Sequence, residues 1–312
     1  MIPRVVIAGG TGFIGSALAR SLRERGNEVV VLTRFPPRRR GDGVREVQWH
    51  PRTDAKEAGG PRSPWWGEVA GARAVINLAG ASIDCVHNAE NRQRILRSRV
   101  DAVRALGAAV AAADRPPATW VQASAVGYYG TGPARRDETA PAGEGFKAEV
   151  CRAWEGAFAE SCPAAVRPVV LRIGVVLGRK GGAYPRLARV VRLFLGGAAG
   201  DGRQGLSWIL LEDLVAVFLR AVEHEPMRGA YNACAPEPVA NADLMRALRL
   251  SLRRPWSPPA PAWAIRVVAP LVLRTEPDLI LKGQFAVPAR LEAEGFRFRA
   301  PRLASALSAL AD

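Results

Sequence analysis

The chain has 312 residues, 48% of them hydrophobic, which is enough for one large core or for a core with a smaller lobe. Its apolar stretches fall short of the roughly 20 residues of a membrane span, and its four cysteines and three histidines lack metal-ligand spacing. The net charge of +15 comes mainly from arginine, since only four of the 44 basic residues are lysine. Because the arginines are spread along the chain, we attribute them to coding bias in a GC-rich genome rather than to nucleic-acid binding.

Short apolar runs alternate with amphipathic segments over the first 174 residues. This alternation predicts βαβ units with a parallel sheet and right-handed crossovers. Strands are expected at 4–8, 28–33, 44–48, 73–77, 118–124 and 166–172, and helices at 13–25, 90–112 and 147–160. Two stretches rich in Pro, Gly and Arg, 35–43 and 51–64, are typical of surface loops.

After residue 174 the pattern becomes mainly helical. Helices are expected at 184–195, 211–223, 241–252 and 262–273, and short elements at 278–292 and 301–311. We therefore predict an α/β protein with a Rossmann-type doubly wound parallel sheet over residues 1–174, to which 205–228 return. Residues 175–204 and 229–312 would form a smaller C-terminal α/β substrate lobe.

A glycine-rich turn joins the first expected strand to the first expected helix. Gly9 would allow the tight turn, Gly12 would let the backbone approach a pyrophosphate, and Gly15 would let the helix pack closely on the strand. The phosphates would lie on the unpaired N–H groups of the helix start. This arrangement predicts a dinucleotide site.

The end of the second strand indicates which dinucleotide is bound. NAD enzymes usually place an acidic residue here to accept hydrogen bonds from the ribose 2′-hydroxyl, whereas this chain has Thr33 and Arg34. A guanidinium can grip a 2′-phosphate through two hydrogen bonds. We predict NADP(H) rather than NAD(H), with Arg34 as the principal residue. Arg38, Arg39 and Arg40 follow closely, and a solvated basic loop is the alternative interpretation of these three.

Several later motifs, taken in order, point to a known family. They are Asn-Leu-Ala-Gly at 77–80, Ser-Ala-Val-Gly-Tyr-Tyr-Gly at 124–130, Arg-Ile-Gly-Val-Val-Leu-Gly at 172–178, Gly-Asp-Gly-Arg-Gln at 200–204 and Trp-Ile at 208–209. A C-terminal segment, 283–298, adds to them. Together with the glycine turn they resemble the extended short-chain dehydrogenase/reductase superfamily. Within it they resemble the atypical branch of "epimerase family proteins", named after nucleoside-diphosphate-sugar epimerases.

The resemblance implies a role for a set of individual residues. Those expected at the cofactor are Gly9, Gly12, Phe13, Ile14, Gly15, Thr33, Arg34, Arg38, Leu78, Ala79, Gly80, Ser124, Arg172 and Gly174. Those expected to face the substrate are Arg203, Trp208 and Asn232. No metal ligand is expected.

The catalytic pattern of the superfamily is incomplete in this chain. Its usual Tyr-x-x-x-Lys pair is absent: with Glu155 as the reference, Lys147 takes the tyrosine position and Cys151 the lysine position. The candidate proton donors are Ser124, Tyr128, Tyr129 and Lys147. Ser124 faces the site or only caps a strand end, depending on a one-residue register. Tyr128 and Tyr129 either reach the substrate or pack beneath the cofactor.

The sequence thus favours an NADP(H)-dependent oxidoreductase or epimerase that transfers hydride to or from a small polar substrate. A sugar nucleotide and another carbonyl metabolite are both open as substrates. The alternative is a non-catalytic NADPH-binding redox sensor or scaffold, since such proteins keep the phosphate cradle and lose the proton donor. We expect a cytoplasmic monomer or homodimer with no nucleic-acid or membrane partner.

Overall fold

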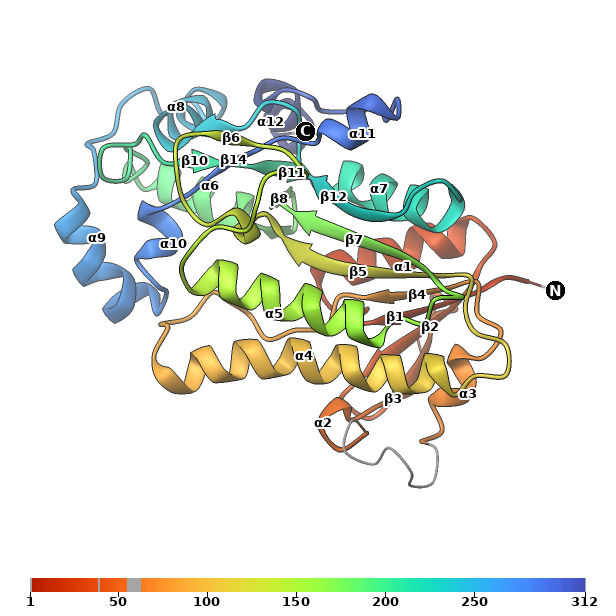
Figure 1. The fold of residues 1–312 in the computed structure, drawn as a ribbon. Helices are drawn as coiled ribbons and strands as arrows, with labels where there is room; N and C mark the ends of the chain where they lie inside the picture. Colours follow the sequence, from red (N-terminus) through yellow and green to blue (C-terminus); the bar gives the residue numbers. More distant parts are fainter. Residues whose placement is uncertain (1, 39, 55–62, 312) are drawn as a thin grey trace.

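A seven-stranded parallel sheet forms the centre of the protein (Figure 1). The computed structural model describes residues 2–38, 40–54 and 63–311. The strands lie in the order β12-β7-β5-β4-β1-β2-β3. Their bounds are β1 (Arg4–Ala8), β2 (Glu28–Thr33), β3 (Arg45–Gln48), β4 (Ala74–Asn77), β5 (Thr119–Ala125), β7 (Arg167–Ile173) and β12 (Gly229–Ala233).

The strand order reverses between β1 and β4. From β1 the chain proceeds to β2 and β3 on one side, then returns to β4 and continues through β5, β7 and β12 on the other. In open sheets of this kind, ligands bind outside the carboxyl ends of the strands at such a switch point. The glycine turn follows β1, and Leu78 follows β4, so both lie at this point.

Helices cover both faces of the sheet (Figure 1). Val5 and Ile7 pack with α1 and α7 in one core cluster, whereas Val6 and Ala8 pack with α4 and α5 in another. This alternation follows from the two-residue period of a strand. The helices around the sheet are α1 (Phe13–Glu24), α2 (Pro51–Asp54), α3 (Trp66–Val69), α4 (Ala89–Ala111), α5 (Phe146–Ser161) and α7 (Leu211–Glu223).

The remaining elements form a smaller C-terminal lobe with its own core. Its helices are α6 (Tyr184–Arg192), α8 (Asn241–Ser251), α9 (Ala262–Val268), the π-helical turn η2 (Ala269–Leu273), α10 (Asp278–Leu281), α11 (Ala289–Ala293) and α12 (Leu303–Ala311). Its strand pairs are β8 (Val175–Gly178) with β9 (Gly181–Gly182) and β11 (Trp208–Leu210), β10 (Gly205–Leu206) with β13 (Val239–Ala240), and β14 (Phe285–Ala286) with β6 (Arg135–Arg136).

Most of the expected elements are present. Each strand and helix predicted before residue 174 lies within about one residue of its expected ends. Two boundaries require correction. Residues 229–233, placed by the sequence in the smaller lobe, form β12 at the edge of the large sheet. Residues 205–210, placed by the sequence with the large sheet, form β10 and β11, which pair with strands of the smaller lobe. Among the described residues, no helix combines the length and apolar character needed to cross a bilayer. No cluster of potential metal ligands occurs among those residues either.

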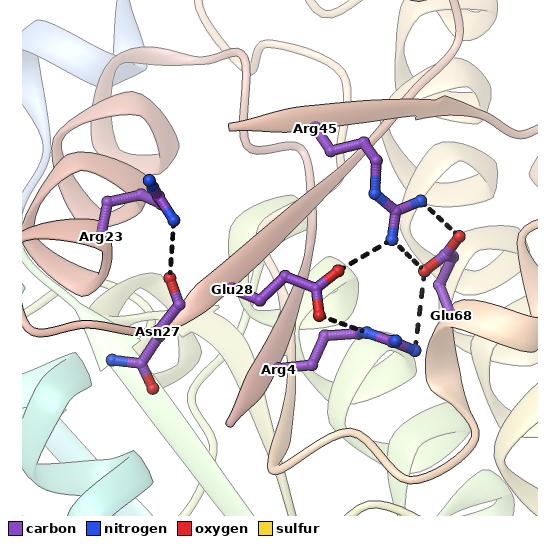
Figure 2. A network of polar contacts seen from close by, with 6 residues as sticks. All are labelled: Arg4, Arg23, Asn27, Glu28, Arg45 and Glu68. Carbon is purple, nitrogen blue, oxygen red and sulfur yellow. Dashed lines mark hydrogen bonds and ion pairs between the residues drawn. The ribbon is translucent and has the colours of Figure 1, made fainter. Parts of the chain in front are cut away.

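An ion-pair network holds the amino ends of the first three strands together (Figure 2). Glu28 accepts hydrogen bonds from Arg4 at 3.1 Å and from Arg45 at 3.0 Å, and Arg45 also binds Glu68 of α3. Burial acts to raise the pKa of Glu28, but the two arginines outweigh it and leave the pKa below its ordinary value. The network lies at the end of the sheet opposite to the switch-point crevice.

Replacing Arg45 should weaken this end of the sheet only modestly. Because its partners are partly exposed and screened by solvent, we expect Arg45→Gln to lower the free energy of unfolding by about 1 kcal/mol at low salt. The loss should shrink in 1 M NaCl, where exposed charges are screened within a few ångströms. Urea denaturation at both salt concentrations measures it, with the exposed Arg104→Gln in α4 as the control. A loss that is equal at both concentrations would contradict the electrostatic origin.

Candidate functional site

A cleft of about 880 Å³ opens at the carboxyl ends of β1, β2 and β4, at the switch point. Seven of the residues predicted at the cofactor line it: Gly9, Gly12, Thr33, Arg34, Leu78, Ala79 and Gly80. The cleft therefore lies where the sequence predicts the adenosine and pyrophosphate groups of a dinucleotide.

The glycine turn has the geometry of a phosphate cradle. Gly9 has a left-handed φ of 80°, and a Cβ there would lie 2.8 Å from the carbonyl carbon of Leu78. A Cβ on Gly15 would lie 2.6 Å from the carbonyl oxygen of Gly9, whereas one on Gly12 would meet only that oxygen, at 3.4 Å. Helix α1 has no side-chain cap at its start. Its first N–H groups are thus available to an anion, as pyrophosphate binding requires.

The end of β2 presents Arg34 to the cleft. Arg34 is exposed and lines it, while Thr33 is buried and its hydroxyl accepts a hydrogen bond from the N–H of Phe35. Arg38 is exposed but does not line the cleft. Arg40 is paired with Asp42 and Glu46, and Arg39 lies outside the described residues. Among the described arginines of this segment, Arg34 is accordingly the one that lines the cleft.

Other cleft residues were missed by the sequence. Arg52 lies in a stretch read as a surface loop, and Arg94, Ser98 and Asp101 come from α4. Arg94, Ser98 and Asp101 are separated by four and then by three residues, which puts them on one face of the helix. This spacing is the sequence signal that could have identified them. Asp101 is 3.8 Å from Arg52. The lining carries three arginines and one acidic residue, which favours a ligand with several negative charges.

Two residues of the glycine turn serve packing. The ring of Phe13 lies against Gly178, Gly181 and Gly182 of the β8–β9 hairpin, where a side chain would collide with it. Ile14 packs on the core between α1 and the sheet. Phe13 thereby joins the start of α1 to the smaller lobe.

A buried polar network lies at the carboxyl ends of β5, β7 and β12. Glu155 of α5 accepts hydrogen bonds from the Ser124 hydroxyl at 2.6 Å and from two nitrogens of Arg172 at 2.8 and 3.0 Å. Arg172 also donates to the Tyr129 hydroxyl at 2.9 Å, which in turn donates to Asn232 at 2.8 Å. The chain of contacts joins five side chains from four elements and the turn η1 (Val126–Tyr129).

The network includes four of the residues that the sequence predicted at the site, and it corrects the position of one of them, Asn232. Desolvation raises the pKa of Tyr129 to about 12 despite the nearby Arg172, and its hydroxyl is held between Arg172 and Asn232. Asn232 is fully buried, with its amide donating to Val287, so it does not face a substrate cleft. Ser124 is also buried and bound to Glu155. These hydrogen bonds hold the strand ends together, and the catalytic roles expected of Ser124 and Tyr129 stay predictions.

Tyr128 and Lys147 remain accessible at the same end of the sheet. The guanidinium of Arg172 lies 3.5 Å from the ring centre of Tyr128, which is partly exposed. Lys147 is half-buried at the start of α5, and desolvation lowers the pKa of its ammonium group. Cys151 is buried one turn further on, where desolvation raises the pKa of its thiol to about 11. The side chain of Lys147 is thus partly exposed, whereas that of Cys151 is buried.

Gly174, Trp208 and Arg203 are the remaining residues that the sequence predicted at the site. Gly174 is buried where β7 leads into β8, and a Cβ there would lie 2.8 Å from the carbonyl oxygen of Ser207. Trp208 is fully buried in the core of the smaller lobe and donates to the carbonyl of Glu237, which corrects its assignment to the substrate cleft. Arg203 is exposed. Of the three expected substrate residues, Arg203 alone offers a free side chain.

The cradle, the positive cleft and the switch point define a Rossmann-type NAD(P)-binding protein. Residues 5–234 match the NAD dependent epimerase/dehydratase family, to which this chain belongs, and residues 260–310 match a domain of unknown function (DUF1731). The chain is 36% identical over 310 residues to epimerase family protein SDR39U1 of Bos taurus, covering 97% of this chain and 98% of that protein. These matches confirm the resemblance seen in the sequence.

Two solved structures share the fold and the family. The crystal structure of human epimerase family protein SDR39U1 with NADPH has a TM-score of 0.84 at 32% identity and covers 99% of both chains. The nucleoside-diphosphate sugar epimerase from Corynebacterium glutamicum has a TM-score of 0.77 at 31% identity, covering 99% of this chain and 58% of that one. The fold of the whole chain, smaller lobe included, is thus that of a nicotinamide-cofactor protein.

The two adjacent tyrosines should differ in their effect on stability. Tyr129→Phe leaves Asn232 and Arg172 each short of a buried partner, so we expect it to lower the free energy of unfolding by about 2 kcal/mol. Tyr128→Phe keeps the ring beneath Arg172 and should change it by about 0.5 kcal/mol or less. Urea denaturation of both variants provides the measurement. Equal losses would show that the hydroxyl of Tyr129 is not the one that the network needs.

Proposed function

We propose that the protein is an NADP(H)-dependent oxidoreductase or epimerase acting on a small polar substrate, either a sugar nucleotide or another carbonyl metabolite. The observation that carries the proposal is the cleft, in which Arg34 stands at the end of β2 where NAD enzymes place a carboxylate. Arg52 and Arg94 add positive charge to the same lining. The crystal structure of human SDR39U1 with NADPH supports the same choice of cofactor.

Bound nicotinamide supplies or accepts a hydride, and this transfer needs a matching proton on the substrate oxygen. Lys147 is the residue we propose for that proton. It stands at the position of the superfamily's tyrosine, and burial lowers the pKa of its ammonium group toward the working range of a general acid. Arg172 and Tyr128 would form the floor beside it, held in place by Glu155.

A non-catalytic NADPH sensor is the second candidate. The hydrogen bonds of Ser124 and Tyr129 favour it, because both hydroxyls donate their protons to protein partners, Glu155 and Asn232. The two functions differ in one observable property. A reductase oxidises bound NADPH in the presence of a carbonyl substrate, and an epimerase converts a sugar nucleotide to its epimer with no net change in the cofactor. A sensor binds NADPH and does neither across such a panel.

Reversing the charge at Arg34 tests the cofactor assignment. Arg34→Asp should weaken NADPH binding by about 100-fold, since a carboxylate repels the 2′-phosphate, and should change NADH binding by about threefold or less. Fluorescence titration with NADPH, NADP⁺, NADH and NAD⁺ gives the four affinities. Arg38→Asp is the matched control, because it makes the same charge change in the same segment outside the cleft lining. Parallel weakening of NADPH and NADH by Arg34→Asp would overturn the assignment.

Lys147 can be tested without knowledge of the substrate. Since burial lowers its pKa, the unfolded chain binds more protons than the folded one between that lowered value and the ordinary value of about 10.4. The free energy of unfolding should therefore rise with pH through this window, and the rise should be smaller in Lys147→Met. Urea denaturation from pH 7 to pH 10 measures the slopes, with the exposed Lys180→Met as the control.

The same variant tests the catalytic role once a substrate is found. Lys147→Met should lower turnover by about 100-fold or more, the usual contribution of a general acid, and should leave NADPH affinity nearly unchanged. Turnover equal to that of the unmodified protein would remove Lys147 from the mechanism. Loss of NADPH affinity as well would assign Lys147 to cofactor binding instead.

A further inference from the structure

Exposed apolar side chains gather on one part of the smaller lobe. We call this surface the α9 patch and define it by residues 193–195, Trp256, Trp263, 267–268 and 271–273. Ten of the thirteen large hydrophobic side chains that are exposed among the described residues belong to it. Trp263 is 71% exposed and Leu271 is 74% exposed. Contiguous apolar surface of this kind usually marks a site of interaction.

The two segments that form the patch are held side by side. The hydroxyl of Ser257 donates to the carbonyl of Phe194 at 2.6 Å, and the guanidinium of Arg254 lies 4.9 Å from the Phe194 ring. The N–H of Gly200 donates to the carbonyl of Ala260. Phe194 also has a left-handed φ of 59°, which is uncommon for a bulky residue. The loop at 193–195 is thus fixed beside the segment that leads into α9.

Helices α9 and η2 present their larger apolar side chains outward. Their inner side packs through Ile265 and Ala269 against Ala199. Trp263, Val267 and Leu271 follow one another at four-residue intervals, and all three are exposed. A surface helix of a globular domain normally shows the opposite arrangement, with its apolar stripe on the core. In Figure 1, α9 lies at one edge of the molecule, away from α3 and the amino ends of the strands.

Arginines predominate in the two segments that carry the patch, and the acidic residues Asp243 and Glu276 lie just outside them. Residues 244–275 include six arginines and no acidic residue, and residues 183–200 include three arginines and no acidic residue. Arg192, Arg253, Arg266 and Arg274 are exposed, and none of them takes part in an ion pair within the described part of the chain. The surface that covers the patch must therefore be apolar and carry negative charge.

We propose that the α9 patch docks on the surface of an anionic lipid bilayer. Two tryptophans, exposed aliphatic side chains and flanking arginines form the composition of segments that lie in a membrane interface. Anionic headgroups supply the charge complementary to the arginines. The expectation of no membrane partner rested on the lack of a spanning segment, and a docked helix needs none. The proposal is independent of the reaction proposed above.

Two other occupants fit less well. A second copy of the chain would bring its own arginines against these, which opposes association. A protein partner would have to present apolar surface together with acidic side chains, because the exposed arginines of this face have no acidic partner among the described residues. An anionic bilayer offers both an apolar interior and negative charge, and it needs no matching set of side chains.

Co-sedimentation with vesicles tests the proposal. Vesicles of 30% phosphatidylglycerol in phosphatidylcholine should bind the full chain at least tenfold more strongly than vesicles of phosphatidylcholine alone, and 0.5 M NaCl should weaken that binding. Trp263→Ser combined with Leu271→Ser should reduce it at least tenfold. Ile2→Ser is the matched control, since Ile2 is also exposed but lies in the N-terminal segment, outside the patch. Circular dichroism checks that each variant is folded.

Other results would overturn the proposal. Equal binding of the double variant and the unmodified chain would show that the patch is not the contact. Absence of binding to anionic vesicles would exclude the bilayer. A dimer seen by light scattering that disappears in the double variant, without vesicle binding, would assign the patch to a second copy. Retention of an acidic protein by the unmodified chain but not by the double variant, again without vesicle binding, would assign it to a protein partner.

Discussion

The buried ion pair between Glu155 and Arg172 is the interaction on which the site depends. Removing two charges from water is expensive, and the pair is stable because each nitrogen of the guanidinium and each oxygen of the carboxylate has a hydrogen-bond partner. Ser124 occupies one on Glu155, and Tyr129 occupies one on Arg172. The pair therefore fixes the carboxyl ends of β5 and β7 to α5, which is the edge of the sheet where a ligand binds in this fold.

The network extends from this pair into the smaller lobe. The side chain of Asn232 accepts a hydrogen bond from the Tyr129 hydroxyl and donates one to the carbonyl of Val287. Its backbone N–H donates a hydrogen bond to Glu138. Glu138 also accepts a hydrogen bond from the N–H of Arg290. Glu138, which lies between β5 and α5 in the sequence, is thus hydrogen-bonded both to β12 and to the C-terminal segment. Groups that resemble catalytic residues of the superfamily are used here to join the two lobes.

The sequence predicted the sheet well because parallel strands and their helices carry strong local patterns. It missed β12, since Gly229–Ala233 is short, contains two alanines and has no β-branched residue. It predicted the cleft through Gly9 and Arg34, whose roles follow from position in a motif. It could not predict the network, because Ser124 and Glu155 are 31 residues apart and Tyr129 and Asn232 are 103 apart. Such pairs depend on tertiary packing alone.

The excess of arginine has three physical uses that composition alone does not distinguish. Arg34, Arg52 and Arg94 line the cleft, where their charge attracts phosphate. Arg172 is buried, and its charge is balanced by Glu155. Arg266 and Arg274 flank an exposed apolar helix. The segment after that helix is bound to the loop that follows β4, through Thr275 to Asp84 and through Glu276 to the N–H of His87. The apolar helix is thereby tied to the loop that leads from the cleft into α4.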